Sequence, residues 1–179
     1  MSGFVTSVEA APQIVVNRQT SIHTSYEGAH IDASEVYQGC PQKDCIPSIN
    51  KPKFETAKKA KWLSDGAVVF GFLKDGEARA YPQQILNWHE IVNDRIGKSY
   101  FAITFCPLCG SAVAFERSVT GVVTEFGVSG QLHKSDLLMY DRFEGNLWQQ
   151  ITEKAVVGPA ARRNEKLKLL SLATTTWGE

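Results

Sequence analysis

Short apolar runs separated by polar residues and tight turns dominate the middle of the chain. Val68–Leu73, an Asp-Gly turn at 74–77 and Ala78–Tyr81 together predict a β-hairpin. Further extended runs are rich in β-branched and aromatic residues, which favour strands. These runs are Ser99–Phe105, Ala112–Arg117, Val119–Phe126 with a turn at Gly121, and Leu137–Tyr140. The pattern therefore predicts a structure built mainly from short strands.

Two segments have a helical spacing of apolar residues instead. Phe54–Leu63 carries apolar residues among lysines and predicts a short surface helix. Pro82 suits the first turn of a second helix, because its missing N–H is not needed there, and Ile85, His89 and Val92 follow at i, i+4 and i+7. His89 is thus expected on the apolar side of that helix. The resulting fold class is α+β, a β-rich single domain with short strands, hairpins and two or three short helices.

Composition narrows the range of partners. The chain has 179 residues, and 19 Lys+Arg balance 19 Asp+Glu, so its formal net charge is zero. Nucleic acid is not an expected partner, because no block of basic residues is present to neutralise phosphates. The cluster at 162–168 is expected to be a solvated surface. No run approaches the ~18 apolar residues of a membrane span, so none is expected.

The N-terminal region gives little information about domain organisation or compartment. Residues 1–33 are weakly patterned and are expected to form an N-terminal extension or edge segment beside a domain at 34–179. Residues 1–16 lack the basic start and apolar run of a signal peptide. The chain as given can be a mature form, so this does not fix the compartment.

The chain's four cysteines fall into two close pairs, and the second pair lies between two predicted strands. It occupies the run Cys-Pro-Leu-Cys-Gly at 106–110. Strand, turn and strand in this order resemble the metal knuckle of zinc ribbons and rubredoxins, whereas a thioredoxin-type redox motif normally begins a helix. The alternatives are a metal site, a redox pair, and buried thiols that only pack. The extended flanks favour metal.

A knuckle supplies only two ligands, Cys106 and Cys109, so a metal needs more. His89 is the candidate third ligand, with a satisfied core histidine as the alternative. The set would be a Cys₂His site with one open position, a known catalytic zinc arrangement. Zinc is the first choice of metal, and thiolates also suit copper or iron. Glu90 points about 100° away around the helix and is expected at the surface. The remaining histidines, His23, His30 and His133, are expected to be solvated.

Cys40 and Cys45 form the other pair, in a segment at 39–47 where Gly and two prolines predict a loop. Their spacing fits a small disulfide loop, which would stabilise the fold by roughly 2 kcal/mol. It equally fits a second knuckle, which would complete a Cys₄ site with the pair at 106 and 109. The spacing alone leaves both alternatives open.

The longest motifs resemble the domain of unknown function 3179 family over Ser34–Glu179. Members carry residues corresponding to His89, Cys106 and Cys109, and many look exported, which implies an extracytoplasmic location. The resemblance implies no established activity. The motifs that carry it are AYPQQILNWHEIVND at 80–94, TFCPLCGSA at 104–112, FGVSG at 126–130, DLLMYDR at 136–142 and LW at 147–148.

Departures from the family pattern add three expectations. Relatives usually have glycines at the positions of Cys40 and Cys45, which argues against a Cys₄ site shared by the family. The resemblance therefore implies a Cys40–Cys45 disulfide that is particular to this chain. Relatives also tend to have Tyr-Asn or a similar pair in place of His133-Lys134, so the resemblance implies no role for His133. The typical family sequence continues beyond Glu179, and the C-terminus is therefore expected to be truncated or unusual.

Three functional hypotheses follow. The first is a metal-binding protein, or an exported metalloenzyme, that uses Cys106, Cys109 and His89 and acts on an unknown small-molecule or protein substrate. The second is a thiol-disulfide oxidoreductase with Cys106 as nucleophile and Cys109 as resolving thiol. The third is a noncatalytic binding module with a structural knuckle. Glu90, Ser129 and Asp136 are candidates to support the ligands or contact substrate. The alternative is a surface carboxylate or helix salt-bridge partner for Glu90, and turn hydrogen bonding for Ser129 and Asp136. Trp88, Tyr140 and Trp148 are expected to line a core or a groove.

Overall fold

The computed structural model describes residues 4–7 and 26–179. Short strands account for most of its regular structure, as the sequence predicts, and the helices are short. Neither α-helix of this described part has the length and apolar character needed to cross a bilayer. The helices are η1 (Ala33–Glu35), α1 (Gln83–His89) and α2 (Pro159–Arg162). The strands are β1 (Phe4–Ser7), β2 (Val36–Gln38), β3 (Lys53–Thr56), β4 (Val68–Lys74), β5 (Glu77–Pro82), β6 (Ile91–Ile96), β7 (Ser99–Cys106), β8 (Ser111–Glu116), β9 (Ser118–Val119), β10 (Val122–Val123), β11 (Phe126–His133), β12 (Asp136–Asp141), β13 (Leu147–Gln149), β14 (Ala155–Val157), β15 (Leu169–Leu170) and β16 (Ala173–Thr176).

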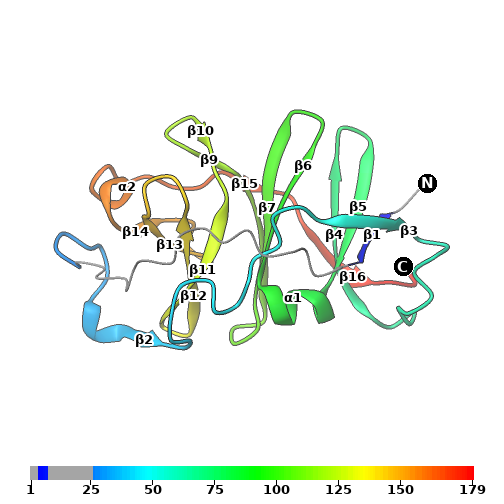
Figure 1. Cartoon of the computed structure of the whole chain (residues 1–179), viewed down its shortest axis with the longest axis horizontal. Coiled ribbons are helices and arrows are strands. Elements are labelled where there is room, and N and C mark those ends of the chain that lie inside the picture. The colour runs from blue at the N-terminus through cyan, green and yellow to red at the C-terminus, as the bar shows by residue number, and fades with distance from the viewer. Residues whose placement is uncertain (1–3, 8–25) are drawn as a thin grey trace.

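Three larger sheets lie side by side along the long axis of the molecule (Figure 1). The central sheet has the strand order β15-β8-β7-β6. One flanking sheet has the order β16-β4-β5-β1-β3, and the other has the order β14-β13-β12-β11-β2. All the strand pairs are antiparallel except β1 with β5, and β9 and β10 form a separate small hairpin. The central sheet is therefore covered on both faces.

Alternation along β7 directs side chains into two hydrophobic cores. Phe101, Ile103 and Phe105 pack into the core shared with β4 and β5. Ala102 and Cys106 point to the opposite core, which β11, β12 and β13 complete. Successive strand residues point to opposite faces of a sheet, so one strand can contribute to both cores. This explains why β7 is apolar at almost every position.

Aromatic side chains from two sheets meet in the core beside β4. The rings of Phe72 and Phe101 stack with centroids 4.2 Å apart, and those of Phe70 and Phe105 lie 5.2 Å apart. All four side chains are buried. Each such burial contributes roughly 1.5–3 kcal/mol to folding. These contacts attach the β4–β5 hairpin to the central sheet.

The hairpin prediction at 68–81 is confirmed, with β4 and β5 in antiparallel register. Asp75 and Gly76 form the turn with φ of 50° and 81°, the left-handed conformation that two-residue hairpin turns require. The helix predicted at 54–63 is wrong. Residues 53–56 form β3, which pairs with β1, and the rest are turns. Strand pairing overrides the weak helical pattern there.

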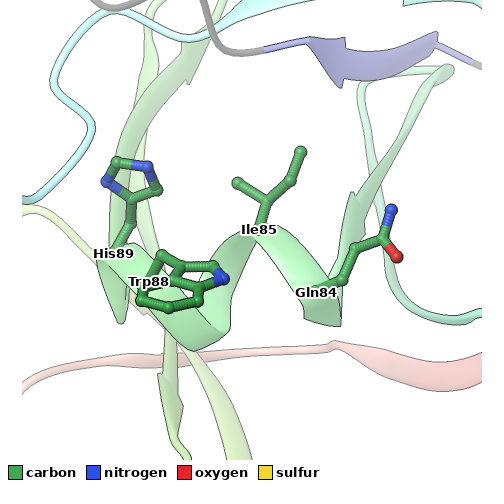
Figure 2. A pocket seen from close by; sticks show the side chains of 4 residues that line it. All are labelled: Gln84, Ile85, Trp88 and His89. Atoms are coloured by element: carbon green, nitrogen blue, oxygen red, sulfur yellow. The ribbon is translucent and has the colours of Figure 1, made fainter.

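The second predicted helix is shorter than expected. α1 begins at Gln83 and ends at His89, and Val92 lies in β6 opposite Ile103 of β7. Leu86 is its buried residue, whereas His89 is only partly covered. His89 lies on the same side of α1 as Ile85 (Figure 2), which packs against the core, but its own burial is incomplete. Val92 fits the helical spacing only by coincidence. It is apolar because it lies in the buried strand β6.

Candidate metal centre

The knuckle lies at the turn between β7 and β8. Cys106, the last residue of β7, pairs with Ser111, the first residue of β8. Gly110 has a φ of 63° and donates its N–H to the Cys106 carbonyl at 2.9 Å, which closes the turn. A residue with a Cβ would be strained in this left-handed conformation. The result is a buried Cys106 with 1% exposure and an exposed Cys109.

Asp136, the first residue of β12, completes a cluster with the two cysteines. The potential ligand atoms of these three residues all lie within 4.8 Å of one another. The Cys109 Sγ is 3.7 Å from Asp136 Oδ1, and the amide of Ile151 donates to Asp136 Oδ2 at 3.0 Å. The Ile151 contact fixes one carboxylate oxygen and leaves the other facing the sulfur. Two thiols and a carboxylate thus converge from separate sheets.

A polar network holds the exposed cysteine in place. Ser111 Oγ lies 2.9 Å from Cys109 Sγ and donates to Gln150 Oε1 at 2.8 Å. The fully buried Gln150 in turn donates from Nε2 to Thr104 Oγ1 at 3.0 Å. Hydrogen-bonded neighbours of this kind orient ligands in metal sites. Sequence reasoning missed Ser111 and Gln150, because no local spacing connects them.

Burial governs the electrostatics of the cluster. Removal from water, and then the neighbouring Cys109 side chain, raise the pKa of the Cys106 thiol to about 12. Burial also raises the pKa of Asp136, against the lowering effect of its hydrogen bonds. Burial therefore shifts both side chains toward their protonated forms when no cation is nearby. A bound metal reverses this preference, because it requires deprotonated ligands.

His89 lies at the end of α1, outside the cluster. Its Nδ1 is 2.7 Å from the Pro47 carbonyl oxygen. Among the described residues, His89 belongs to no group of three potential ligands within 4.8 Å of one another. Figure 2 shows His89 with Gln84, Ile85 and Trp88 around an open pocket of about 430 Å³. The Cys₂His set is thus not assembled in this structure.

The groups expected to support the ligands have different environments. Glu90 follows α1 with a φ of 56°, and burial raises its pKa to about 7. Ser129 is fully buried, and its Oγ accepts a hydrogen bond from the Gln131 amide at 3.0 Å, so it makes the turn contact that was the alternative. Asp136 is the member of this group that joins the cysteines.

The remaining aromatic and histidine side chains have mixed outcomes. Trp88, expected in the core or a groove, is 77% exposed and lines the open pocket beside α1, because α1 buries its Leu86 side. His133, expected in solvent, is buried between Glu35 and Gln149, because β11 pairs with β2 over it. Trp148 and Tyr140 are buried, and His30 is exposed. His23 lies outside the described residues.

The other cysteine pair is separate from the cluster. Cys40 and Cys45 lie at disulfide distance, with Cα atoms 6.3 Å apart, in the predicted loop. Cys106 and Cys109 are the free cysteines. A Cys₄ site is therefore not formed. The loop instead docks on β11, where the Gly39 and Cys40 amides donate to the Gly130 carbonyl at 2.9 and 3.1 Å.

Comparison with known proteins gives a family and no activity. No curated protein and no solved structure matches the chain. One family model, described as a protein of unknown function (DUF3179), matches residues 43–179. This range contains the whole cluster and its polar network, and it confirms the resemblance noted from the motifs. The chain belongs to the DUF3179 family.

Proposed function

We propose that the protein binds one transition-metal ion, zinc by first choice, through Cys106, Cys109 and Asp136. The observation that carries this proposal is the convergence of three potential ligand atoms within 4.8 Å of one another. The ligands come from the β7–β8 turn and from β12, which belong to different sheets. Thiolate and carboxylate ligands are compatible with zinc, and the two thiolates also suit copper(I) or iron.

Three protein ligands leave one position of a tetrahedral ion open. This number distinguishes catalytic zinc sites from closed structural ones, which use four ligands. Cys109 lies on the exposed side of the cluster, and its neighbour Leu108 is 68% exposed. Ile151, whose amide contacts Asp136, is 54% exposed. A substrate that reaches the ion would meet these apolar side chains, and the metal would act as a Lewis acid or activate water.

Metal content in matched variants tests the ligand set. Protein purified without chelator is compared by elemental analysis with Cys106→Ser, Cys109→Ser and Asp136→Asn, and His89→Ala is the control. The proposal predicts near-stoichiometric metal in the wild type and the control. It predicts at least a tenfold loss of affinity in each ligand variant, since removing one ligand costs more than 1.4 kcal/mol. Near-ultraviolet circular dichroism verifies that the variants fold.

Unchanged metal affinity in Asp136→Asn would remove the carboxylate from the ligand set. Loss of metal in His89→Ala with a folded protein would restore the histidine to it. Cobalt(II) provides an independent readout, because thiolate coordination produces charge-transfer absorption that a cysteine-free site lacks. This absorption should disappear in a folded Cys106→Ser, Cys109→Ser double variant.

Thiol-disulfide exchange is the second candidate function, because the two free sulfurs also lie within 4.8 Å of each other. The exposure of the two thiols favours the reverse of the roles expected from the sequence. Cys109 is exposed and can attack a partner disulfide, whereas Cys106 is buried and its pKa is raised to about 12. Equilibration of metal-free protein with glutathione buffers tests this function. A reversible Cys106–Cys109 disulfide that supports reduction of a model disulfide would favour it over metal binding.

A further inference from the structure

A second cavity, of about 420 Å³, lies at the opposite end of the central sheet from the knuckle. The turn that joins β6 to β7 and the small β9–β10 hairpin border it, and both lie at the edge of the molecule away from α1 (Figure 1). β7 spans the distance between the two sites, from Ser99 at the cavity to Cys106 at the knuckle. At about 3.3 Å per residue, β7 separates the two sites by about 23 Å.

Basic side chains dominate the charged lining of this cavity. Lys74, Lys98, Arg117 and Lys168 face one acid, Glu116. Glu116 pairs with Lys168 at 2.7 Å, and Lys74 makes a long contact of 3.8 Å with the exposed Asp75. The lining therefore has a net positive charge in a protein whose formal net charge is zero. Such a local excess attracts anions into a cleft.

Arg117 is a buried cation in the lining of the cavity. Its side chain is only 7% exposed and is held in place on one side, where Nη1 donates to the Thr124 carbonyl at 2.9 Å. The guanidinium lies over the ring of Tyr100, 5.5 Å from its centroid. Its Nε is buried and has no hydrogen-bond partner. Glu125 and Asp94 act on it electrostatically, but neither makes a hydrogen bond to Nε.

A buried guanidinium whose Nε lacks a partner is poorly compensated, and an anion held nearby would offset its charge. A ligand oxyanion in the cavity would offset the charge of Arg117 and would also meet Lys98, whose flexible side chain reaches the same space. The apolar lining next to these groups includes Tyr100, Val123 and Leu170. The cavity thus combines an oxyanion site with apolar surface, which is the composition typical of small-molecule sites.

We propose that this cavity binds a small organic anion, with its phosphate or carboxylate group at Arg117 and Lys98 and its apolar part against Tyr100. The site is independent of the metal cluster, because it uses other residues at the far end of β7. It depends on no step of the proposed metal chemistry. Its ligand is either an effector or a second substrate group, and the binding measurement below does not depend on which.

Binding of defined probes tests the proposal. Phenyl phosphate, benzoate and inorganic phosphate are titrated separately into the full chain and followed by amide chemical shifts, at concentrations up to about 10 mM. The expected result is saturable binding of phenyl phosphate or benzoate, with shifts at residues 98–101 and 116–123. Inorganic phosphate should bind more weakly, because it leaves the apolar lining uncovered. The affinity should also fall as salt screens the cations.

Matched variants separate a built site from general charge attraction. Lys98→Gln should weaken binding about three- to fivefold, the size of an exposed ion-pair contact. Lys58→Gln removes the same charge from an exposed turn outside the cavity and should change nothing. Arg117→Gln should abolish binding, provided that its spectrum shows a folded protein. Absence of saturable binding for all three probes, or equal weakening in Lys98→Gln and Lys58→Gln, would overturn the proposal.

Discussion

At the scale of single residues, the sequence identifies the two cysteines of the cluster but not Asp136 as the third potential ligand. Cys106 and Cys109 share one turn, so their spacing reveals their proximity. Asp136 is close only because β12 lies beside the knuckle, a contact between segments that no local pattern encodes. His89 was selected by helical periodicity, and that periodicity fails where α1 ends and β6 begins. The third member of the cluster is therefore set by a contact between distant segments, which the spacing of residues along the chain cannot show.

Glu90 carries a residue-scale prediction about pH. Burial raises its pKa to about 7 from an ordinary value of 4.5. Between these values the folded state retains a proton that the unfolded state loses, so this group makes the stability fall as pH rises. Glu90→Gln cannot ionise and should remove that fall. The variant should gain up to about 3 kcal/mol relative to wild type between pH 4.5 and pH 8.

Urea unfolding across this pH range measures the difference between the two proteins. Glu153→Gln is the matched control, because Glu153 also has a positive φ, 60°. The control should follow the wild-type pH profile. If the stability difference between Glu90→Gln and wild type stays constant from pH 4.5 to pH 8, Glu90 does not titrate as burial requires.

At the scale of elements, local turn chemistry predicts the hairpins and the 39–47 loop, while strand partners decide the rest. The β4–β5 turn has an Asp-Gly sequence, and Asp-Gly between two apolar runs strongly favours a two-residue hairpin turn. In contrast, residues 53–56 become β3 because β1 is available to pair with them. The place where the 39–47 loop docks is also hidden in the sequence. Gly130, on β11, receives it through its carbonyl group.

Gly130 allows a prediction about this docking. It has a φ of 80°, and a Cβ built there would lie 2.6 Å from the Cys40 carbonyl oxygen. Gly121 has the same φ of 80° but open space around it. Gly121→Ala should therefore cost only the left-handed strain, about 1–2 kcal/mol. Gly130→Ala adds a backbone clash and should cost at least about 2 kcal/mol more.

Guanidinium chloride unfolding of the two variants compares these costs directly. Because both substitutions add one methyl group at the same φ, the difference between them isolates the contact with the loop. Equal destabilisation would show that the loop moves away without cost and is not held by β11. An increased sensitivity of the loop to proteolysis in Gly130→Ala alone would agree with the expected loss of docking.

At the scale of the whole molecule, the sequence predicts a β-rich fold but not how its sheets are arranged. β15 pairs with β8, β16 with β4 and β2 with β11, and each pair joins segments far apart in the chain. Such pairings depend on the complete fold rather than on local propensity. The doubly covered central sheet follows from them. The apolar character of β7 on both faces was the one signal that could have predicted it.

The doubly covered central sheet predicts which backbone amides are best protected from hydrogen exchange. β7 is paired on both edges and covered on both faces, so its amides should exchange with solvent only through global unfolding. Amides of the β9–β10 hairpin, whose second strand is exposed, should exchange at least about a hundredfold faster. Native-state hydrogen exchange measures both. Protection of β11–β13 that outlasts protection of β7 would contradict a shared central sheet.

The central claim is that two thiolates and one carboxylate hold a single metal ion. The X-ray absorption spectrum of the zinc-loaded protein tests it most directly, because sulfur and oxygen ligands differ in both distance and scattering. The account predicts two sulfur ligands at about 2.3 Å and oxygen ligands at about 2.0–2.2 Å, from Asp136 and the open position. A spectrum with four sulfurs, with imidazole ligands, or with no sulfur at all would contradict it.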